Sequence, residues 1–384
     1  YTSVTSEKVD PESSGVMIHK PGEAHPGYNL YCCERCPDIF LIDMTGEIVH
    51  RWTYPGRPGA RWHHAILLPD GDIVAVAKEP NGLMRLDWNS DVVWEKAIAA
   101  HHDVVLAPDK TLYAIAGEKK MYRDLEVEFP SILHMTLDGD TIDTWSAFEH
   151  LDAIKETFDQ SWFLDTILDS MMGQRKRDRM LDPIVRRAHR TGQPTEELVY
   201  DYFHMNTVGI IPETPLGESD PRFKPGNLLI CFRNVNQVAI LDKVTGEILW
   251  VWGEGIVEWP HHPTMLEDGN ILIFDNGSRR GYSKVLEIDP VTGAIEWEYA
   301  GVPMGSFYSF SRGSAQRLPN GNTLICEGDE GRVFEVNRAG EIVWKWLNST
   351  TPEGYREQVY RMIRIPPDEV EPLLSEQGTQ PGNP

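Results

Sequence analysis

The chain has 384 residues, of which 41% are hydrophobic and 25% are charged, as in an ordinary globular protein. Its formal net charge of −23 argues against a nucleic-acid partner and against an acidic membrane surface, because both require a basic face on the protein. No apolar run approaches the roughly eighteen residues that span a bilayer, so the sequence predicts no membrane span. A small molecule is the ligand that we expect.

A pattern of short strands and tight turns recurs along the chain. Each copy contains four apolar runs separated by Asp, Asn, Pro or Gly, which is typical of a four-stranded antiparallel sheet. One such sheet cannot bury both faces, so the copies are expected to stack radially. The sequence therefore predicts an all-β, six-bladed β-propeller that forms a single domain over residues 1–384. Each copy ends near one tryptophan, and these are Trp52, Trp94, Trp145, Trp252, Trp297 and Trp346.

The first blade in chain order is split between the two ends of the chain. Residues 28–33, 39–43 and 47–52 supply three strands, and residues 360–365 are expected to supply the innermost fourth. Pairing the two ends in this way closes the ring and leaves no exposed sheet edge. The other five blades are predicted over residues 63–94, 101–145, 204–252, 261–297 and 314–346.

Three cysteines lie in this first blade, at Cys32, Cys33 and Cys36. A zinc site normally needs a second pair of ligands, and none follows nearby. We interpret the three residues as structural or as partners in a local disulfide. Cys231 and Cys326 lie in apolar strands and are expected to be buried core thiols.

An insertion is predicted at residues 147–200, because two successive closing tryptophans are unusually far apart there. Apolar spacing predicts a helix over residues 151–172, and a proline at an early helical position predicts another over residues 182–192. The segment is rich in arginine between residues 175 and 190. These charges form either a solvated helical face or a lid that attracts an anionic substrate to the channel of an otherwise acidic protein.

The two ends of the chain carry weaker signals. Residues 366–384 are rich in Pro, Glu and Gln and are expected to be poorly ordered. The sequence begins at Tyr1 without a charged-then-apolar signal segment. We expect a periplasmic or secreted protein if a leader has been removed, and a cytoplasmic one otherwise.

Histidines open the first strand of several predicted blades. In a propeller this strand lies innermost, so equivalent positions face one another around the axis. Because side chains alternate across a strand, one member of each His-His pair is expected to point into the channel. Such a cluster of imidazoles indicates catalysis or metal binding. Counted back from the turn glycine, His64 and His262 share one position and His102 aligns to within a residue. The predicted inward set is His64, His102, His204 and His262.

Four short segments carry a likeness to a known family. They are His-His-Asp-Val at 101–104, Phe-His-Met-Asn-Thr at 203–207, Cys-Phe-Arg at 231–233, and His-His at 261–262 with Phe-Asp-Asn-Gly at 274–277. In order and phase these segments resemble the bacterial arylsulfotransferase (aryl sulfate sulfotransferase) family, whose fold is a six-bladed propeller. The likeness of the repeats covers most of residues 15–365.

The resemblance implies transfer of a sulfuryl group between phenolic compounds, without a nucleotide sulfate donor or another cofactor. It implies that His262 becomes sulfurylated, while His204, Asn206, Arg233 and His102 surround the group in flight. Neutral imidazole is a competent nucleophile near pH 7, and fixed donors such as Arg233 and Asn206 meet the charge on the sulfuryl oxygens. An imidazolium at His204 or His102 can protonate the departing phenolate. The expected partner is a small aromatic, phenolic and anionic substrate.

Two other functions fit the same residues. His64, His102, His204 and His262 can also be read as ligands for zinc, copper or iron. A metal-dependent lyase, hydrolase or oxidase acting on a phenolic small molecule is then expected. A non-catalytic binding propeller is the remaining alternative. Arg233 and Asn206 favour sulfuryl transfer, because an anionic transferred group explains them, whereas His64 favours the metal.

Overall fold

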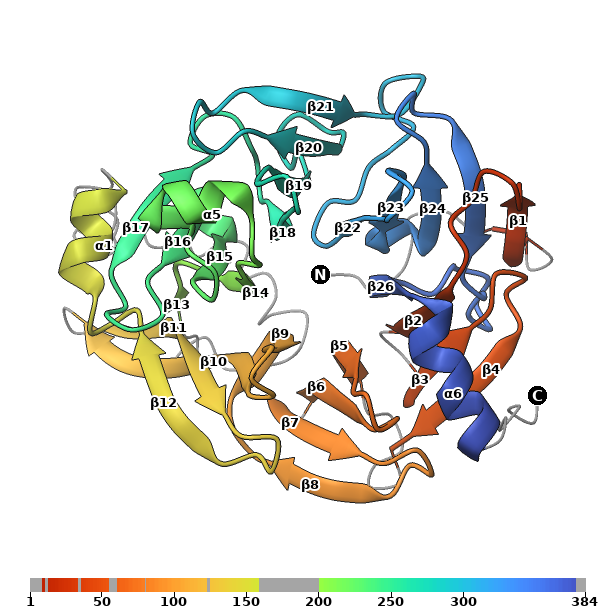
Figure 1. The fold of residues 1–384 in the computed structure, drawn as a ribbon, viewed down its shortest axis with the longest axis horizontal. Helices are drawn as coiled ribbons and strands as arrows, with labels where there is room; N and C mark the ends of the chain where they lie inside the picture. The colour runs from red at the N-terminus through yellow and green to blue at the C-terminus, as the bar shows by residue number, and fades with distance from the viewer. Residues whose placement is uncertain are drawn as a thin grey trace.

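The computed structural model describes residues 9–10, 13–33, 36–54, 61–79, 81–122, 125–158 and 200–377. In these parts of the chain the strands form six sheets arranged in a ring (Figure 1). The prediction of a six-bladed β-propeller is therefore confirmed. No helix in the described ranges is long and apolar enough to cross a membrane.

The first three complete blades follow one another along the chain, and each is built from the axis outward. Blade 1 contains β5 (Arg61–Leu67), β6 (Ile73–Glu79), β7 (Asn81–Leu86) and β8 (Val92–Lys96). Blade 2 contains β9 (Ala100–Leu106), β10 (Leu112–Tyr122), β11 (Leu125–Met135) and β12 (Thr141–Ser146), with β13 (Tyr200–Asp201) pairing in parallel with β11. Blade 3 contains β14 (Met205–Ile210), β15 (Leu228–Phe232), β16 (Gln237–Leu241) and β17 (Ile248–Trp252).

The remaining blades complete the ring. Blade 4 contains β18 (His261–Met265), β19 (Ile271–Asp275), β20 (Lys284–Ile288) and β21 (Ile295–Tyr299). Blade 5 contains β22 (Ser314–Arg317), β23 (Thr323–Glu327), β24 (Arg332–Val336) and β25 (Ile342–Leu347). Blade 6 contains β26 (Val359–Ile365), β2 (Tyr28–Cys33), β3 (Asp38–Ile42) and β4 (Ile48–Thr53).

Burial follows the place of a strand in its blade. The second strands β15 and β19 are buried at every position, because the adjacent blades cover both of their faces. The rim strand β21 has the sequence Ile-Glu-Trp-Glu-Tyr. Its Ile and both Glu side chains are exposed, and its Trp and Tyr side chains are half-buried. The apolar core is therefore distributed between neighbouring blades rather than collected in one centre.

The ring is closed where the two ends of the chain meet, as the sequence predicts. Strand β26 pairs antiparallel with β2, with Ile365 opposite Tyr28. Arg364 on β26 forms a 2.7 Å ion pair with Glu335 of blade 5, and both side chains are almost fully buried. The same guanidinium donates to the Asn29 side chain and to the His25 carbonyl oxygen.

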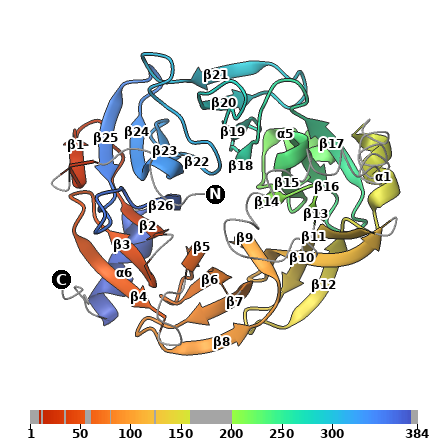
Figure 2. The same cartoon turned by 180° about the vertical axis from the view of Figure 1, so that it is seen from behind.

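Two elements at the ends of the chain differ from the expectation. Strand β1 (Gly15–His19), which the repeat pattern does not predict, adds a fifth strand to the rim of blade 5. The composition of the tail predicts poor order, but residues Pro367–Gln377 form helix α6, which lies beside blade 6 (Figure 2). Val370 and Leu373 explain the helix, because both are buried in the core between blades 6 and 1. Residues 378–384 lie outside the described ranges.

Of the predicted insertion, the structure describes the beginning and the end. Helix α1 (Leu151–Thr157) buries Leu151 and Ile154 against the core between blades 2 and 3. The arginine-rich part and the predicted second helix lie outside the described residues. Another short helix, α5 (Pro215–Ser219), and 3-10 turns at Pro221–Phe223, Arg233–Val235 and Gly328–Glu330 complete the helical elements that the described residues form.

Tryptophans at the rim bind each blade to the next one. Their indole N–H groups donate to carbonyl oxygens in the outer turn of the following blade at 2.8–3.0 Å, from Trp94 to Leu137, Trp145 to Gly246, Trp250 to Pro290, Trp297 to Arg338 and Trp344 to Met44. Between blades 6 and 1 the same bond is made by a histidine, since His50 Nε2 lies 3.0 Å from the Trp88 carbonyl oxygen. Trp94, Trp145 and Trp297 of the predicted set thus have a structural role, whereas in blades 3 and 5 the bond is made by Trp250 and Trp344, two residues before the predicted tryptophans.

All five cysteines are free in this structure. The Cys33 and Cys36 thiols are hydrogen-bonded to each other, which raises the pKa of Cys33 and lowers that of Cys36. Cys231 and Cys326 are buried, as expected.

Candidate active site

The inner strands meet at the axis, and their register decides which residues are equivalent. Leu67, Leu106 and Met265 each pair with the first residue of the second strand of their blade. Three residues before these positions stand His64, Asp103 and His262. The equivalent of His64 and His262 in blade 2 is thus Asp103, one residue beyond the predicted His102.

Neighbouring residues of an inner strand point to opposite sides, and each strand therefore supplies two different groups of side chains. The first group, which we call the Tyr360 cluster, consists of His63, His102, His204, Arg233, His261 and Tyr360. The second, the Arg361 cluster, consists of His64, Asp103, His262 and Arg361. Adjacent pairs such as Tyr360 and Arg361 contribute one member to each cluster.

The Tyr360 cluster is built around His102. Its Nδ1 lies 2.9 Å from the Tyr360 hydroxyl, and its backbone N–H donates to His63 Nδ1 at 2.9 Å. The rings of His63 and His204 each lie 4.7 Å from the His102 ring, measured between centroids. Burial lowers the pKa of His102 well below its ordinary value, and the charges of His204 and other neighbours add to this effect. His102 is therefore a neutral imidazole at pH 7.

His204 comes immediately before β14 and is held by Asp201. The Asp201 carboxylate accepts the backbone N–H of His204 at 3.0 Å and also pairs with its Nδ1. Although burial opposes ionisation, the charge of His204 and its hydrogen bond, with Arg233 and His101, lower the pKa of Asp201 to about 2. His204 has a φ of 50°, a left-handed backbone that His102 and His262 share, with φ of 63° and 47°.

The two ring nitrogens of His261 differ, because in the part of the chain that the structure describes Nδ1 is hydrogen-bonded and Nε2 is not. Its Nδ1 lies 2.6 Å from Asn276 Oδ1 and 3.0 Å from the Trp259 carbonyl oxygen. Asn276 Nδ2 donates to two carbonyl oxygens, so the amide presents its oxygen to the imidazole. His261 must then carry its proton on Nδ1, which leaves the Nε2 lone pair available. Nε2 is buried and has no hydrogen-bond partner among the described residues.

Arg233 supplies the positive charge of the Tyr360 cluster. Its guanidinium lies 4.7 Å from the centre of the Trp259 ring and is largely buried. After burial, its charge is the next cause of the lowered pKa of His261. The Trp259 ring also lies 5.0 Å from Phe310, which is partly exposed. A cation and aromatic surfaces therefore border the same imidazole.

The Arg361 cluster is dominated by an internal ion pair. Arg361 holds both carboxylate oxygens of Asp103, at 2.7 and 3.2 Å, although the residues come from opposite ends of the sequence. His64 Nε2 lies 3.9 Å from the same carboxylate. His262 Nδ1 lies 3.1 Å from the Ala315 carbonyl oxygen. Burial and then the Arg361 charge lower the pKa values of His64 and His262.

The predicted inward histidines thus fall into different clusters. His102 and His204 belong to the Tyr360 cluster, whereas His64 and His262 belong to the Arg361 cluster. Within the described ranges, no group of three or more His, Cys, Asp or Glu side chains is arranged to hold a metal ion. Asn206 is fully buried and bonds the Pro260 carbonyl oxygen and the Thr207 hydroxyl, so its amide supports the strand.

Several residues of these clusters escape a search based on sequence. Alternation and the count back from the turn glycine select His262 and His64 for the channel, and therefore pass over His261 and His63. Asp201 directly follows the predicted insertion, and no repeat or turn signal marks it. Asp103 could have been found by counting back from Lys110, which occupies the turn position of the usual glycine with a φ of 63°. Counted back in the same way from Ile365, which pairs with Tyr28, the histidine phase gives Met362 in the closing strand, so it does not indicate Tyr360 or Arg361.

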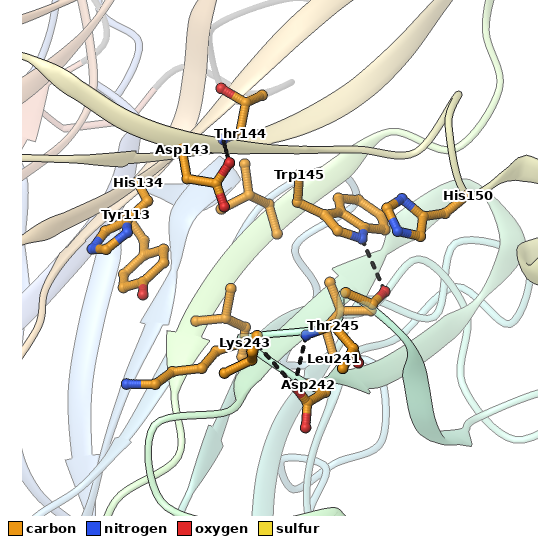
Figure 3. Close-up of a pocket in the computed structure, with 14 residues that line it drawn as sticks. Tyr113, His134, Asp143, Thr144, Trp145, His150, Leu241, Asp242, Lys243 and Thr245 are labelled. Atoms are coloured by element: carbon orange, nitrogen blue, oxygen red, sulfur yellow. Dashed lines mark hydrogen bonds between the residues drawn. The ribbon is translucent and has the colours of Figure 1, made fainter.

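A separate hollow of about 120 Å³ lies between blades 2 and 3, away from the axis (Figure 3). Its wall includes Tyr113 stacked on His134, with ring centroids 4.5 Å apart, and Trp145 bonded to Gly246. Lys243 lies on the facing blade. The lining residues come from the outer parts of both blades, so this hollow is distinct from the channel clusters.

The fold and the site together define a six-bladed propeller with an axis lined by histidines. The chain belongs to the arylsulfotransferase (ASST) family, whose model matches residues 64–349. No curated protein matches the chain.

Solved structures resemble the chain in fold. A protein of unknown function from Bacteroides caccae is 14% identical, with a TM-score of 0.54 over 88% of this chain and 98% of that one. A streptogramin B lyase is 12% identical, with a TM-score of 0.48 over 94% of this chain and 96% of its own. At such identities the similarity concerns the fold alone.

Proposed function

We propose that the protein transfers a sulfuryl group from an aryl sulfate to a phenol, and that a channel histidine carries the group between them. Membership of the arylsulfotransferase family supports this reaction type. The observation that carries the proposal is the state of His261. It is a neutral imidazole, tethered through Nδ1, whose buried Nε2 has no hydrogen-bond partner among the described residues, and its pKa is lowered by burial and then by the charge of Arg233.

His261 is a better nucleophile than His262 for this reaction. The resemblance to the family implies His262, with Arg233, His204 and His102 around the transferred group. In the structure these three side chains share a cluster with His261 instead. After burial, the charge of Arg361 is the next cause of the lowered pKa of His262, and Arg361 already holds Asp103 with two hydrogen bonds.

The transfer takes place in two displacements. In the first, His261 Nε2 attacks sulfur, an N–S bond forms, and the S–O bond to the donor phenol breaks. In the second, the oxygen of the acceptor phenol attacks sulfur and the N–S bond breaks, which regenerates neutral His261. Arg233 stabilises the charge on the sulfuryl oxygens in both transition states. Trp259 and Phe310 provide apolar surfaces on which the phenol rings can stack.

The test is an assay with 4-nitrophenyl sulfate as donor and phenol as acceptor. We expect release of 4-nitrophenol together with phenyl sulfate, and no requirement for an added nucleotide. Arg233→Met should lower kcat/KM by about 10²-fold or more, because the charge on the oxygens loses its fixed partner. Arg317→Met is the control, since Arg317 also stacks on a tryptophan, 4.9 Å from the centre of the Trp297 ring, but belongs to neither cluster and pairs with Glu287.

Two results would count against the proposal. One is the absence of sulfated acceptor with a folded, purified protein across a range of phenols. The other is an Arg233→Met enzyme that retains full kcat/KM, because the mechanism gives this cation the main electrostatic role.

A further inference from the structure

The proposed transfer needs a proton donor and acceptor as well as a nucleophile. The departing phenolate must receive a proton, and the incoming phenol must lose one. A histidine suited to this role has to exist in both protonation states during the cycle, whereas a nucleophilic histidine has to be neutral. The partner of each Nδ1 atom distinguishes the two kinds.

The Nδ1 partners of the channel histidines differ in charge. Asn276 and a carbonyl oxygen hold His261, a carbonyl oxygen holds His262, and the Tyr360 hydroxyl holds His102. These neutral partners fix a tautomer without adding a negative charge. His204, by contrast, has a carboxylate at Nδ1, that of Asp201. A carboxylate in this position orients the ring and also stabilises the imidazolium.

Asp201 is itself well fixed. Besides the two contacts to His204, its backbone carbonyl oxygen accepts from Asn234 Nδ2 at 2.9 Å, and β13 places it beside β11. The groups whose charges act on this pair are Arg233 and His101, and the ring of His102 lies against His204. Glu128 on β11 is the neighbouring carboxylate, and burial followed by the charge of Asp201 raises its pKa.

We propose that Asp201 is a positioning residue that makes His204 the general acid and base of the transfer. This inference rests on the proposed function. In the first displacement the proton of the His204 imidazolium passes to the phenolate oxygen as its S–O bond breaks. In the second displacement the acceptor hydroxyl returns a proton to His204 as its oxygen bonds to sulfur. No proton is gained or lost over the cycle.

The leaving group provides a selective test. 4-Nitrophenolate leaves without much help from an acid, whereas unsubstituted phenolate needs a proton. Asp201→Asn should therefore lower kcat/KM for phenyl sulfate by about 10²-fold or more, but for 4-nitrophenyl sulfate by less than about 10-fold. For phenyl sulfate, the fall of activity with rising pH should begin at lower pH in Asp201→Asn, because the imidazolium has lost its carboxylate.

Controls separate this role from a structural one. Glu128→Gln removes the adjacent carboxylate and should leave the dependence on the leaving group unchanged. Asp201→Glu restores a carboxylate and should recover part of the phenyl sulfate activity. Thermal unfolding of each variant shows whether the fold is kept.

The outcomes also separate the inference from the proposed function. If the unmodified protein transfers no sulfuryl group, the proposed function itself fails. If it does transfer the group, and a folded Asp201→Asn variant is slowed equally with both donors and keeps its pH profile, the role of Asp201 is refuted.

Discussion

At the scale of single residues, hydrogen bonds at Nδ1 give chemically identical side chains different roles. His261 is set as a neutral nucleophile by an amide oxygen, and the oxygen is identified by the two other bonds of Asn276. His204 is set as an acid and base by a carboxylate. His102 and His204 keep a left-handed backbone, with φ of 63° and 50°, which costs of order 1–3 kcal/mol per residue. The surrounding strands must supply this free energy.

His50 offers a prediction about pH that does not involve catalysis. Its ring stacks on Trp88 with centroids 3.6 Å apart, and burial lowers its pKa from 6.5 to about 4. Between these values the unfolded chain binds a proton that the folded protein excludes. The stability contributed by neutral His50 is therefore complete above about pH 6.5 and is lost as the pH falls towards 4.

The test is the variant His50→Gln, which keeps a donor for the Trp88 carbonyl oxygen but cannot titrate. At pH 7 it should be less stable than the unmodified protein, because the stacking is reduced. As the pH falls from 6.5 to 4 the difference in the free energy of unfolding, measured with urea, should shrink. A difference that stays constant over this range would show that His50 does not contribute to the pH dependence.

At the scale of elements, the inner strands and the closing strand β26 determine the site. Strands β5, β9, β18 and β26 each bring two adjacent side chains to the axis, one for each cluster. Strand β26 contributes Tyr360 and Arg361 to the two clusters and Arg364 to the ring closure. Because β26 comes from the end of the chain, the site is complete only when the ring has closed.

The buried pair of Arg364 and Glu335 tests the importance of this closure. Arg364→Ala leaves an unpaired carboxylate in the core and should lower the free energy of unfolding by about 3–5 kcal/mol. Arg338→Ala removes a half-exposed arginine from its pair with Glu287 and should cost about 1 kcal/mol or less. Urea unfolding followed by tryptophan fluorescence measures both. Equal losses in the two variants would contradict the special role of the closing pair.

The elements also show what can be predicted from the sequence. Apolar runs, turn residues and repeated tryptophans are local signals, and they predict all six blades and the pairing of the two ends. Strand β1 is not part of the repeat, so the repeat pattern does not predict it. Helix α6 depends on the burial of Val370 and Leu373, whose contacts lie far away in the sequence.

The site is harder to predict for a similar reason. The phase of the histidines indicates the axis, but bulges in the inner strands shift the register by a residue, as between His102 and Asp103. Which member of the pair His261–His262 carries the reaction depends on contacts at Nδ1, such as the one between His261 and Asn276 in the same blade. Asp201 lies only three residues before His204, but no repeat or turn signal marks it.

At the scale of the whole molecule, the propeller keeps two clusters of opposite character on one axis. In the Arg361 cluster the cation holds Asp103 with two hydrogen bonds, whereas in the Tyr360 cluster Arg233 stacks on an aromatic ring, donates to the amide side chain of Asn234 and acts through its charge on Asp201. The net charge of −23 surrounds this internal cation. An anionic sulfate ester therefore gains most from reaching the Tyr360 cluster.

The most direct measurement is to locate the sulfuryl group on the protein during turnover. The protein is mixed with 4-nitrophenyl sulfate without an acceptor, quenched under alkaline conditions, digested and mapped by mass spectrometry. We predict one sulfuryl group on His261, lost on addition of phenol and absent in His261→Ala but present in His262→Ala. A group found on His262, or full transfer activity with no protein-bound sulfuryl group, would contradict this account.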